Sequence, residues 1–588
     1  MHVRGRLLLK SVFFAGAAAA LSLCLAAGAA LLAASGASPA AGSAITAEPY
    51  DLLILNGRVL DGAGNPWRRA DVAVSGGRIA RLGSLEHARA RRRIDAAGRF
   101  VTPGFIDLLG QSEYTLLVDG RGLSKVAQGI TTELTGEGLS PAPHNDETRR
   151  AHEHAEERLG LRIDWVDLEG YYARLERQGL GLNLGTFVGA EQVRRIVLGE
   201  LNEAPTPQQL DDMVDQVVAS MRQGAFGVSS SLIYPPGSYA GMYELVSLAE
   251  AAGRLGGIYI SHIRNESDGI DDALIEAFEI GRLARVPVEI WHLKIAGRQN
   301  WGDMKRVVGR IEEARSGGLD VKANLVPYTA SATTLSACVP PWAREGGTEA
   351  YLARLRDPET RARLKREIGS RPPAGWDNAW YSAGGAEGIV LASVATKKNR
   401  PLQGKRLSEI ARERGADPLD VLLDLILEEK DRAGGIYFEM SEEDIRTALL
   451  RPWVSIVTNS PAVSPDGVLG QVRPHPRAYG SFPRILGRYV REEALLSWEE
   501  AVRRMTSLPA SKVGLRNRGL LREGYWADIV IFDPETVADR ATFEEPARLP
   551  VGIETVLVNG EIVMEQGRHT GRLPGRILRG PAYAGSGR

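Results

Sequence analysis

Cysteine is almost absent from this chain of 588 residues. It occurs twice, as Cys24 and Cys338, and Cys24 lies in an apolar N-terminal stretch that we expect to be removed. Leu23 precedes Cys24 at a position where lipid modification would need a small residue, so we do not expect a lipoprotein. Cys338 would then be the only cysteine, which excludes an internal disulfide even in an oxidising compartment.

The chain also has little net charge. Its 72 Lys and Arg against 73 Asp and Glu leave a formal charge of -1 and a pI near 6.8. Such a balance gives no long-range field to attract nucleic acid or an anionic membrane, so neither is an expected partner. The one basic run, residues 89–93, is interpreted as a solvated loop.

The N-terminal residues differ in kind from the rest, where 44% hydrophobic and 25% charged residues are typical of a soluble globular protein. Arg4, Arg6 and Lys10 precede a long run rich in Ala and Leu, which gives way to small residues. This pattern predicts an export signal over residues 1–47 and a periplasmic or secreted protein. An uncleaved membrane anchor is the alternative.

Eight apolar runs between residues 100 and 460 suit parallel strands, and most are separated by segments with helical apolar spacing. Alternating strands and helices predict an α/β protein, and eight such units predict a closed (β/α)8 TIM-like barrel. The runs are 100–110, 131–138, 182–190, 225–234, 257–263, 286–294, 319–330 and 453–460.

Hairpin patterns flank the predicted barrel. Short alternating runs with Asn-Gly, Gly-Ala-Gly and Gly-Gly follow Tyr50, and a comparable pattern returns only near the C-terminus. We expect residues 50–104 plus 508–588 to form one small β-sandwich domain, and residues 105–507 to form the barrel. About 120 residues separate the seventh and eighth runs, too many for a structureless loop, so residues 331–450 are expected to be an inserted subdomain or lid.

His262 and His292 each end an apolar run, one strand-helix-strand unit apart. A parallel βαβ unit places both imidazoles at the carboxyl ends of neighbouring strands, where α/β barrels build active sites. A single such histidine is more often a hydrogen-bonded core residue. The pair at matched strand ends favours metal binding.

Several stretches resemble the amidohydrolase superfamily, and more closely its N-acyl-D-amino-acid deacylases, or D-aminoacylases. They extend from about residue 52 to residue 569 and include TPGFID, QGITTELTGEG, SHIRNES, HLKIAGRQNWG, PYTASATTLSACVPPWAREGG and HPRAYGSFPRILGRYVREE. The resemblance implies a hydrolase that cleaves the linear amide bond of N-acyl-(D-)amino acids, a carbon–nitrogen bond other than a peptide bond. It also implies one divalent metal ion, with Zn²⁺ expected, that activates water as the nucleophile.

The chain departs from the family at two metal-binding motifs. The His-x-His that follows the first strand in relatives is replaced by a stretch that ends in Leu109, Gly110 and Gln111, so the more exposed metal position is expected to be unbuilt. A cysteine ligand after the second strand is also missing, and Glu137 there is a candidate replacement. With His262 and His292 it would form a His₂Glu site, whose three side chains should converge within about 4 to 5 Å. The alternative for Glu137 is a polar turn residue.

The aspartate that ends the eighth strand in the family is also replaced. Asn459 stands there, and asparagine can orient a water molecule but cannot accept a proton. A nearby carboxylate would have to take over, and Asp466 is paired with Asn459 as the candidate catalytic position. Other candidate carboxylates are Asp107, Glu113, Glu137 and Glu191.

Five residues are candidates for substrate binding. Arg264 and Lys294 each follow a metal-site histidine by two residues, so both are expected over the barrel mouth, where they would bind a carboxylate. An ion pair with a neighbouring acid is the alternative for each. Tyr234 and Tyr328 end the fourth and seventh strands, and Arg477 lies in the sequence HPRAYG.

Two alternatives to the deacylase remain open. One is a catalytically inactive, amidohydrolase-like protein that binds an acidic small molecule, as the loss of the His-x-His, the cysteine and the aspartate would suggest. The other is a dipeptidase or cyclic amidase of the same superfamily, which the fold alone does not separate from a deacylase. The survival of both His262 and His292 favours an enzyme.

Overall fold

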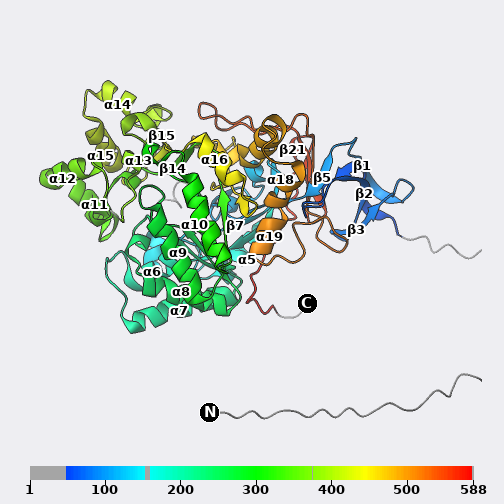
Figure 1. The fold of residues 1–588 in the computed structure, drawn as a ribbon, viewed down its shortest axis with the longest axis horizontal. Helices are drawn as coiled ribbons and strands as arrows, with labels where there is room; N and C mark the ends of the chain where they lie inside the picture. The colour runs from blue at the N-terminus through cyan, green and yellow to red at the C-terminus, as the bar shows by residue number, and fades with distance from the viewer. Residues whose placement is uncertain (1–47, 152–158, 374, 586–588) are drawn as a thin grey trace, which may run out of the picture. The chain divides into compact units, whose positions relative to one another are not determined.

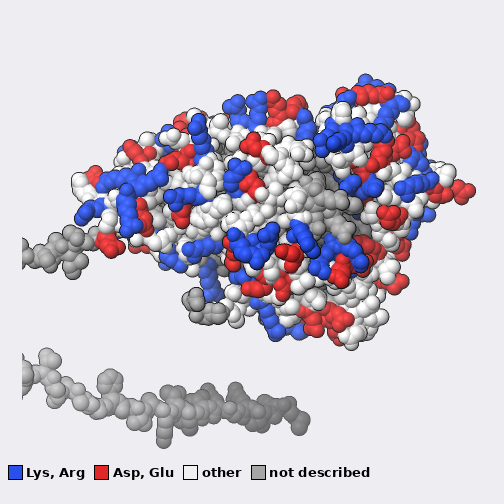
Figure 2. All heavy atoms as spheres, turned by 180° about the vertical axis from the view of Figure 1, so that it is seen from behind, with Lys and Arg blue, Asp and Glu red and all other residues white. Residues whose placement is uncertain are grey.

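The computed structural model (Figure 1) describes residues 48–151, 159–373 and 375–585. The expected export signal, residues 1–47, lies outside the described residues. In the described part of the chain, no helix has both the length and the apolar character needed to cross a membrane. On the face drawn in Figure 2, Lys and Arg side chains are interspersed with Asp and Glu, in keeping with the net charge of -1.

Parallel strands form a closed barrel, and each overlaps one of the eight apolar runs. The strands are β6 (Phe105–Asp107), β7 (Ile130–Thr135), β8 (Asn183–Thr186) with β9 (Val188–Gly189), β10 (Gly227–Ser231), β11 (Ile258–His262), β12 (Val288–Ile290), β13 (Val321–Leu325) and β17 (Val454–Ile456). β8 pairs with β7 and β9 pairs with β10. The chain after β17 closes the ring through a parallel bridge between Gly110 and Ser460. The predicted (β/α)8 barrel is confirmed.

Amphipathic helices cover the barrel. In α9, buried residues recur every three or four positions, from Ile270 through Leu274 to Phe278. α7 begins with a capping box in which Thr206 and Gln209 satisfy each other's backbone N–H groups. The barrel helices are α5 (Leu168–Gln178), α6 (Ala190–Leu198), α7 (Pro207–Arg222), α8 (Met242–Arg254), α9 (Ile270–Ala284), α10 (Met304–Ser316), α16 (Glu442–Leu449) and α18 (Trp498–Met505); shorter segments are α1 (Thr115–Val118), α2 (Leu123–Val126), α3 (Asp146–Ala151), α17 (Arg477–Arg484), η8 (Ile485–Glu492) and α19 (Ser507–Lys512).

The two ends of the chain share one sheet. Its strands are β1 (Tyr50–Val59), β2 (Arg68–Ser75), β3 (Arg78–Gly83), β4 (Ala90–Asp95), β5 (Phe100–Pro103), β18 (Ile529–Phe532), β19 (Ile553–Val558), β20 (Glu561–Glu565) and β21 (Arg568–His569). Antiparallel pairing of β5 with β18 joins the N-terminal strands to the C-terminal ones. Asn559 and Gly560 have positive φ between β19 and β20, as a two-residue hairpin turn requires. Asn56-Gly57 was expected at a hairpin but lies inside β1, where the pairing register shifts as in a β-bulge.

The last described residues leave this sheet. Ile577 forms a parallel bridge with Leu184 of β8, and Gly580 N donates to Gly224 O over 2.8 Å. Residues 574–580 therefore lie against the barrel, whereas the sequence placed them in the β-sandwich domain.

The insertion before β17 has its own sheet and its own core. The sheet consists of β14 (Ala330–Thr334), β16 (Gly434–Phe438) and β15 (Ile389–Ser393). Its apolar core is separate from that of the barrel, and Figure 1 shows its helices grouped together. They are α11 (Gly347–Arg356), α12 (Pro358–Ile368), α13 (Ala379–Ser382), α14 (Leu407–Arg414) and α15 (Pro418–Glu428). α16 lies within residues 331–450, but its buried face belongs to the barrel core. We call residues 330–440 the lid.

Candidate metal centre

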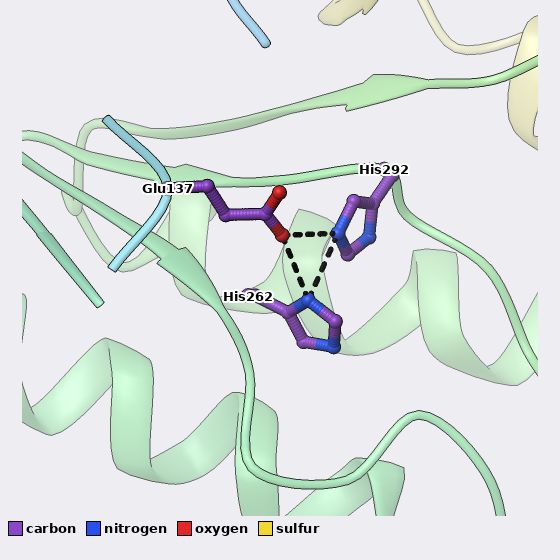
Figure 3. A group of neighbouring side chains, drawn as sticks. All are labelled: Glu137, His262 and His292. Carbon is purple, nitrogen blue, oxygen red and sulfur yellow. Dashed lines mark hydrogen bonds and ion pairs between the residues drawn. The ribbon is translucent and has the colours of Figure 1, made fainter. Parts of the chain in front are cut away.

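Three side chains converge at the carboxyl ends of the barrel strands (Figure 3). Glu137 follows β7, His262 is the last residue of β11, and His292 lies two residues beyond β12. Glu137 Oε1 is 2.9 Å from His262 Nδ1 and 3.2 Å from His292 Nε2, and the two nitrogens are 3.1 Å apart. The expected convergence is confirmed, since one ligand atom from each residue lies within 4.8 Å of the others.

A fourth residue, Glu266, orients both imidazoles. Its Oε2 lies 3.2 Å from His262 Nε2, and its Oε1 lies 3.0 Å from His292 Nδ1. If the outer nitrogens donate to Glu266 and a metal ion displaces the protons of the inner ones, the two inner lone pairs would be directed to one point, as in known metal sites. The sequence analysis missed Glu266, although a carboxylate four residues after a candidate ligand histidine was an available signal.

Charge at this centre follows from the same contacts. Burial raises the pKa of Glu137, but hydrogen bonds from His262 and His292 outweigh it and hold that pKa below its ordinary value. Burial lowers the pKa of His262, but Glu266 and Glu137 outweigh it and raise the value to about 9. Glu137 is therefore an ionised carboxylate, the form that binds a metal ion.

The backbone of His292 has an uncommon conformation. Its φ is 35°, a region that residues with a side chain rarely adopt. The N–H of His292 donates to Asn324 Oδ1 over 2.7 Å, and Asn324 Nδ2 donates to Glu289 Oε1 over 3.2 Å. Asn324 and Glu289 are buried in the barrel, so these hydrogen bonds hold the imidazole on the side of Glu137.

An amide pair, Gln111 and Asn459, lies beside Glu137. Gln111 Nε2 donates to Glu137 Oε2 over 2.8 Å and to Asn459 Oδ1 over 2.9 Å. Leu109 is fully buried in an apolar cluster. An NH₂ group directed at the remaining oxygen of Glu137 repels a second cation, in line with the expectation from the sequence of a single metal ion.

Two candidate site residues, Arg264 and Asp466, do not line the cavity at the barrel mouth. Arg264 does not line the cavity at the barrel mouth, because its guanidinium is paired with Glu276 of α9 over 2.9 Å and donates to the carbonyls of Ser238 and Ala240. It is a structural ion pair, the alternative that the sequence left open. Asp466 is exposed in the loop after β17 and does not line the cavity either. We therefore withdraw Arg264 as a substrate contact and Asp466 as a catalytic residue.

The other candidate substrate contacts line a cavity of about 720 Å³ between the barrel mouth and the lid. Tyr234 packs edge-on against His262 and forms a 2.7 Å hydrogen bond with Thr333 of the lid. Lys294 is paired with Glu266 and lies 3.0 Å from His292 Nδ1, and Tyr328 donates to Asp539 over 3.3 Å. The structure thus brings these side chains to the same cavity as the three converging residues.

Arg477 is buried in the cavity wall without an acidic partner among the described residues. Only 6% of it is exposed, and its Nη2 donates to a backbone carbonyl, that of Ala332, over 3.3 Å. Burial lowers the pKa of Arg477 to about 10, although Glu137 acts in the opposite direction. A buried guanidinium that faces a cavity and lacks a carboxylate is suited to bind one from a ligand.

Glu191 is a buried carboxylate that lines the same cavity. Its Oε1 accepts from Ser231 N over 2.6 Å, and its buried Oε2 has no hydrogen-bond partner among the described residues. A Cβ on Gly138 would lie 2.6 Å from that oxygen, so only glycine leaves room for Glu191 here. Burial raises the pKa of Glu191 to about 7. Asp107, by contrast, is paired with Lys125 in the barrel interior.

A parallel barrel that gathers two histidines and a carboxylate at its strand ends defines a metal-dependent amidohydrolase site. A model of the amidohydrolase family matches residues 339–564. The D-aminoacylase of Alcaligenes xylosoxydans xylosoxydans is 34% identical over 541 residues, which cover 90% of this chain and 98% of that protein. The chain therefore belongs to the amidohydrolase family, and within it to the D-aminoacylases.

Solved structures agree with this assignment. The N-acyl-D-glutamate deacylase of Bordetella bronchiseptica, complexed with zinc and a phosphonate inhibitor, is 35% identical and has a TM-score of 0.77, with 90% of this chain and 100% of that chain covered. A D-aminoacylase with a binuclear metal centre, activated by one metal and attenuated by the second, is 35% identical and has a TM-score of 0.75 over the same shares of each chain.

Proposed function

We propose that this protein is a metal-dependent hydrolase that cleaves the linear amide bond of N-acyl-D-amino acids. The observation that carries the proposal is the convergence of Glu137, His262 and His292 on one point beside a cavity that also presents Arg477. The D configuration is supported by similarity to the D-aminoacylase and the N-acyl-D-glutamate deacylase.

The three donor atoms fit one zinc ion. Ligands of tetrahedral Zn²⁺ at about 2.0–2.2 Å lie roughly 3.3 Å from one another. The separations here are 2.9, 3.1 and 3.2 Å. Two imidazole nitrogens and a carboxylate oxygen suit this metal, and three protein ligands leave a fourth position for water or substrate.

Each residue of the centre has a distinct task. Glu137, His262 and His292 would hold the ion, and Glu266 keeps both imidazoles in the tautomer that can bind it. When bound, the ion polarises the scissile carbonyl and lowers the pKa of water, so that attack occurs at neutral pH. Arg477 binds the α-carboxylate of the substrate, and its burial excludes the water that would weaken that ion pair.

Glu191 is proposed to transfer the proton that Asn459 cannot. An asparagine side chain has no site that accepts a proton at neutral pH, whereas the buried carboxyl of Glu191 has a free oxygen and a pKa of about 7. A group with a pKa near the working pH both accepts a proton from water and returns it to the leaving nitrogen.

The test compares metal content and turnover in the purified chain. We expect about one zinc ion per chain and hydrolysis of N-acetyl-D-amino acids in preference to the L-isomers, and both zinc and activity should be lost in His262→Ala. His87→Ala is the matched control, because His87 lies on the surface beside Glu86. A chain that binds N-acyl amino acids with neither metal nor turnover would instead be the binding protein that the sequence left open.

We also propose that the enzyme acts outside the cytoplasm. The support is the sequence of residues 1–47, in which basic residues precede a long apolar run and small residues. Cell fractionation with N-terminal sequencing of the exported protein tests this. A chain found in the cytoplasm that still begins at Met1 would refute it.

A further inference from the structure

The lid makes polar contacts with the barrel at the loop that carries Glu266. Asp377 of the lid lies between α12 and α13, far along the chain from this loop. Its Oδ2 accepts from Glu266 N over 2.8 Å, and its Oδ1 accepts from Ser267 Oγ over 2.8 Å. One lid carboxylate thus holds two successive residues of the loop.

We propose that Asp377 is a positioning residue of the metal centre. By fixing the backbone of Glu266, it places the carboxylate that orients His262 and His292, so the lid is a structural part of a site to which it gives no ligand. This inference rests on the proposed function, because it assumes that the two imidazoles bind a metal ion.

Other hydrogen bonds also hold this loop, and the carbonyl of Glu266 accepts from Ala296 N over 2.7 Å. Asn265 Oδ1 accepts from the N–H groups of Ser267 and Gly269, each over 2.9 Å, and forms a local turn. Asp268 accepts from Gln299 over 2.8 Å and from Asn300 over 2.9 Å, which ties the end of the loop to the barrel. The N–H of Glu266 itself donates to Asp377.

The electrostatic environment of the Asp377 carboxylate supports its role in holding the loop. Burial and the neighbouring Glu266 both raise the pKa of Asp377, so electrostatics alone disfavours an ionised carboxylate here. Its hydrogen bonds to Glu266 N and Ser267 Oγ offset part of that cost. A second lid contact, between Arg371 and Asp268, is a weaker tie because the Arg371 side chain is 72% exposed and solvent screens the pair.

The consequence for the metal follows from the position of Glu266. Removing a carboxylate that orients a ligand histidine typically weakens metal binding about 10-fold to 100-fold. Asp377 acts one step further from the ion, so we expect Asp377→Ala to weaken zinc binding about tenfold. Asp377→Asn should stay within about threefold of the wild type, because its Oδ1 can accept from Glu266 N while Ser267 Oγ accepts from its Nδ2.

The experiment measures zinc affinity by competition with a chelator, and the visible spectrum of the cobalt-substituted protein, both without substrate. Asp377→Ala should weaken affinity and shift the cobalt spectrum, and Asp377→Asn should restore both. Asp420→Asn is the control, because Asp420 pairs with Arg361 and Lys365 inside the lid. Arg371→Ala should change affinity less than twofold.

A folded Asp377→Ala protein with wild-type affinity and spectrum would overturn the inference. If that variant does not fold, Asp377→Ser replaces it, since the shorter side chain cannot reach both partners, and a wild-type cobalt spectrum there would be equally decisive against it. Failure of the proposed function looks different, because the wild-type chain itself would then bind no metal.

Discussion

Replacing Arg477 by methionine should make the protein more stable and much less active. The lowering of the Arg477 pKa from 12.5 to about 10 corresponds to about 3 kcal/mol, at about 1.4 kcal/mol for each pH unit. Because the folded-state pKa is the lower of the two, the charged guanidinium destabilises the folded state at every pH below about 10. Loss of the bond to Ala332 O costs about 1 kcal/mol, so Arg477→Met should gain about 2 kcal/mol at pH 7.5.

Activity should move in the opposite direction. A hydrogen bond between charged groups contributes about 1.5 to 3 kcal/mol, so kcat/KM for an N-acyl-D-amino acid should fall about 10-fold to 100-fold. The same substrate with its carboxylate converted to an amide lacks the partner of Arg477, and its kcat/KM should change less than threefold. Arg477→Lys is the control that keeps the charge but not the bidentate fork.

Chemical unfolding of the metal-loaded chain at pH 7.5 measures the stability, and steady-state kinetics on the two substrates measures the activity. The reasoning is refuted if Arg477→Met is less stable than the wild type. It is equally refuted if the acid and the amide lose kcat/KM by the same factor, because Arg477 would then shape the site without binding the carboxylate.

Three further predictions concern the carboxylates and the amide pair. Glu191→Gln should lower kcat about 100-fold or more at unchanged zinc content, and should remove the limb of the pH–rate profile near pH 7. A rate within threefold of the wild type would exclude Glu191 as the proton carrier. Gln111→His combined with Asn459→Asp should raise the zinc content from one to two ions per chain, since Gln111 contacts Glu137 Oε2 and Asn459 contacts Gln111. Excess zinc should then inhibit, and a single ion by elemental analysis would contradict this. Burial raises the pKa of Glu289 to about 7, so its ionisation destabilises the folded state as pH rises from about 4.5 to above 7. The free energy of unfolding of Glu289→Gln should match that of the wild type at pH 4 and exceed it by about 3 kcal/mol at pH 8.5. A difference that is independent of pH in chemical unfolding would refute that account.

The barrel and its metal-site pair were predictable because both depend on regular repeats. Buried parallel strands produce apolar runs, and a residue at the end of such a run lies at the barrel mouth whatever the loops do. His262 and His292 were found in this way. Glu137 was found through the resemblance, because it stands after the second strand where relatives carry a cysteine ligand.

Residues in irregular loops were not predictable in the same way. Arg264 and Lys294 share the same offset from a histidine, but Arg264 turns outward to Glu276 of α9 and Lys294 turns inward to Glu266. No sequence period specifies the direction of a side chain beyond the end of a strand. The contact of Asp377 with Glu266 joins residues 111 positions apart, and such a pairing is visible only after both loops are placed.

The pairing of β5 with β18 has a consequence for how the chain is made. β18–β21 and residues 574–580 are synthesised last, yet they complete the sheet begun by β1–β5 and cover the side of β8. Contacts between the two ends have very large sequence separation, and such contacts form late in folding. An emerging chain therefore cannot complete this sheet until β18–β21 have been synthesised.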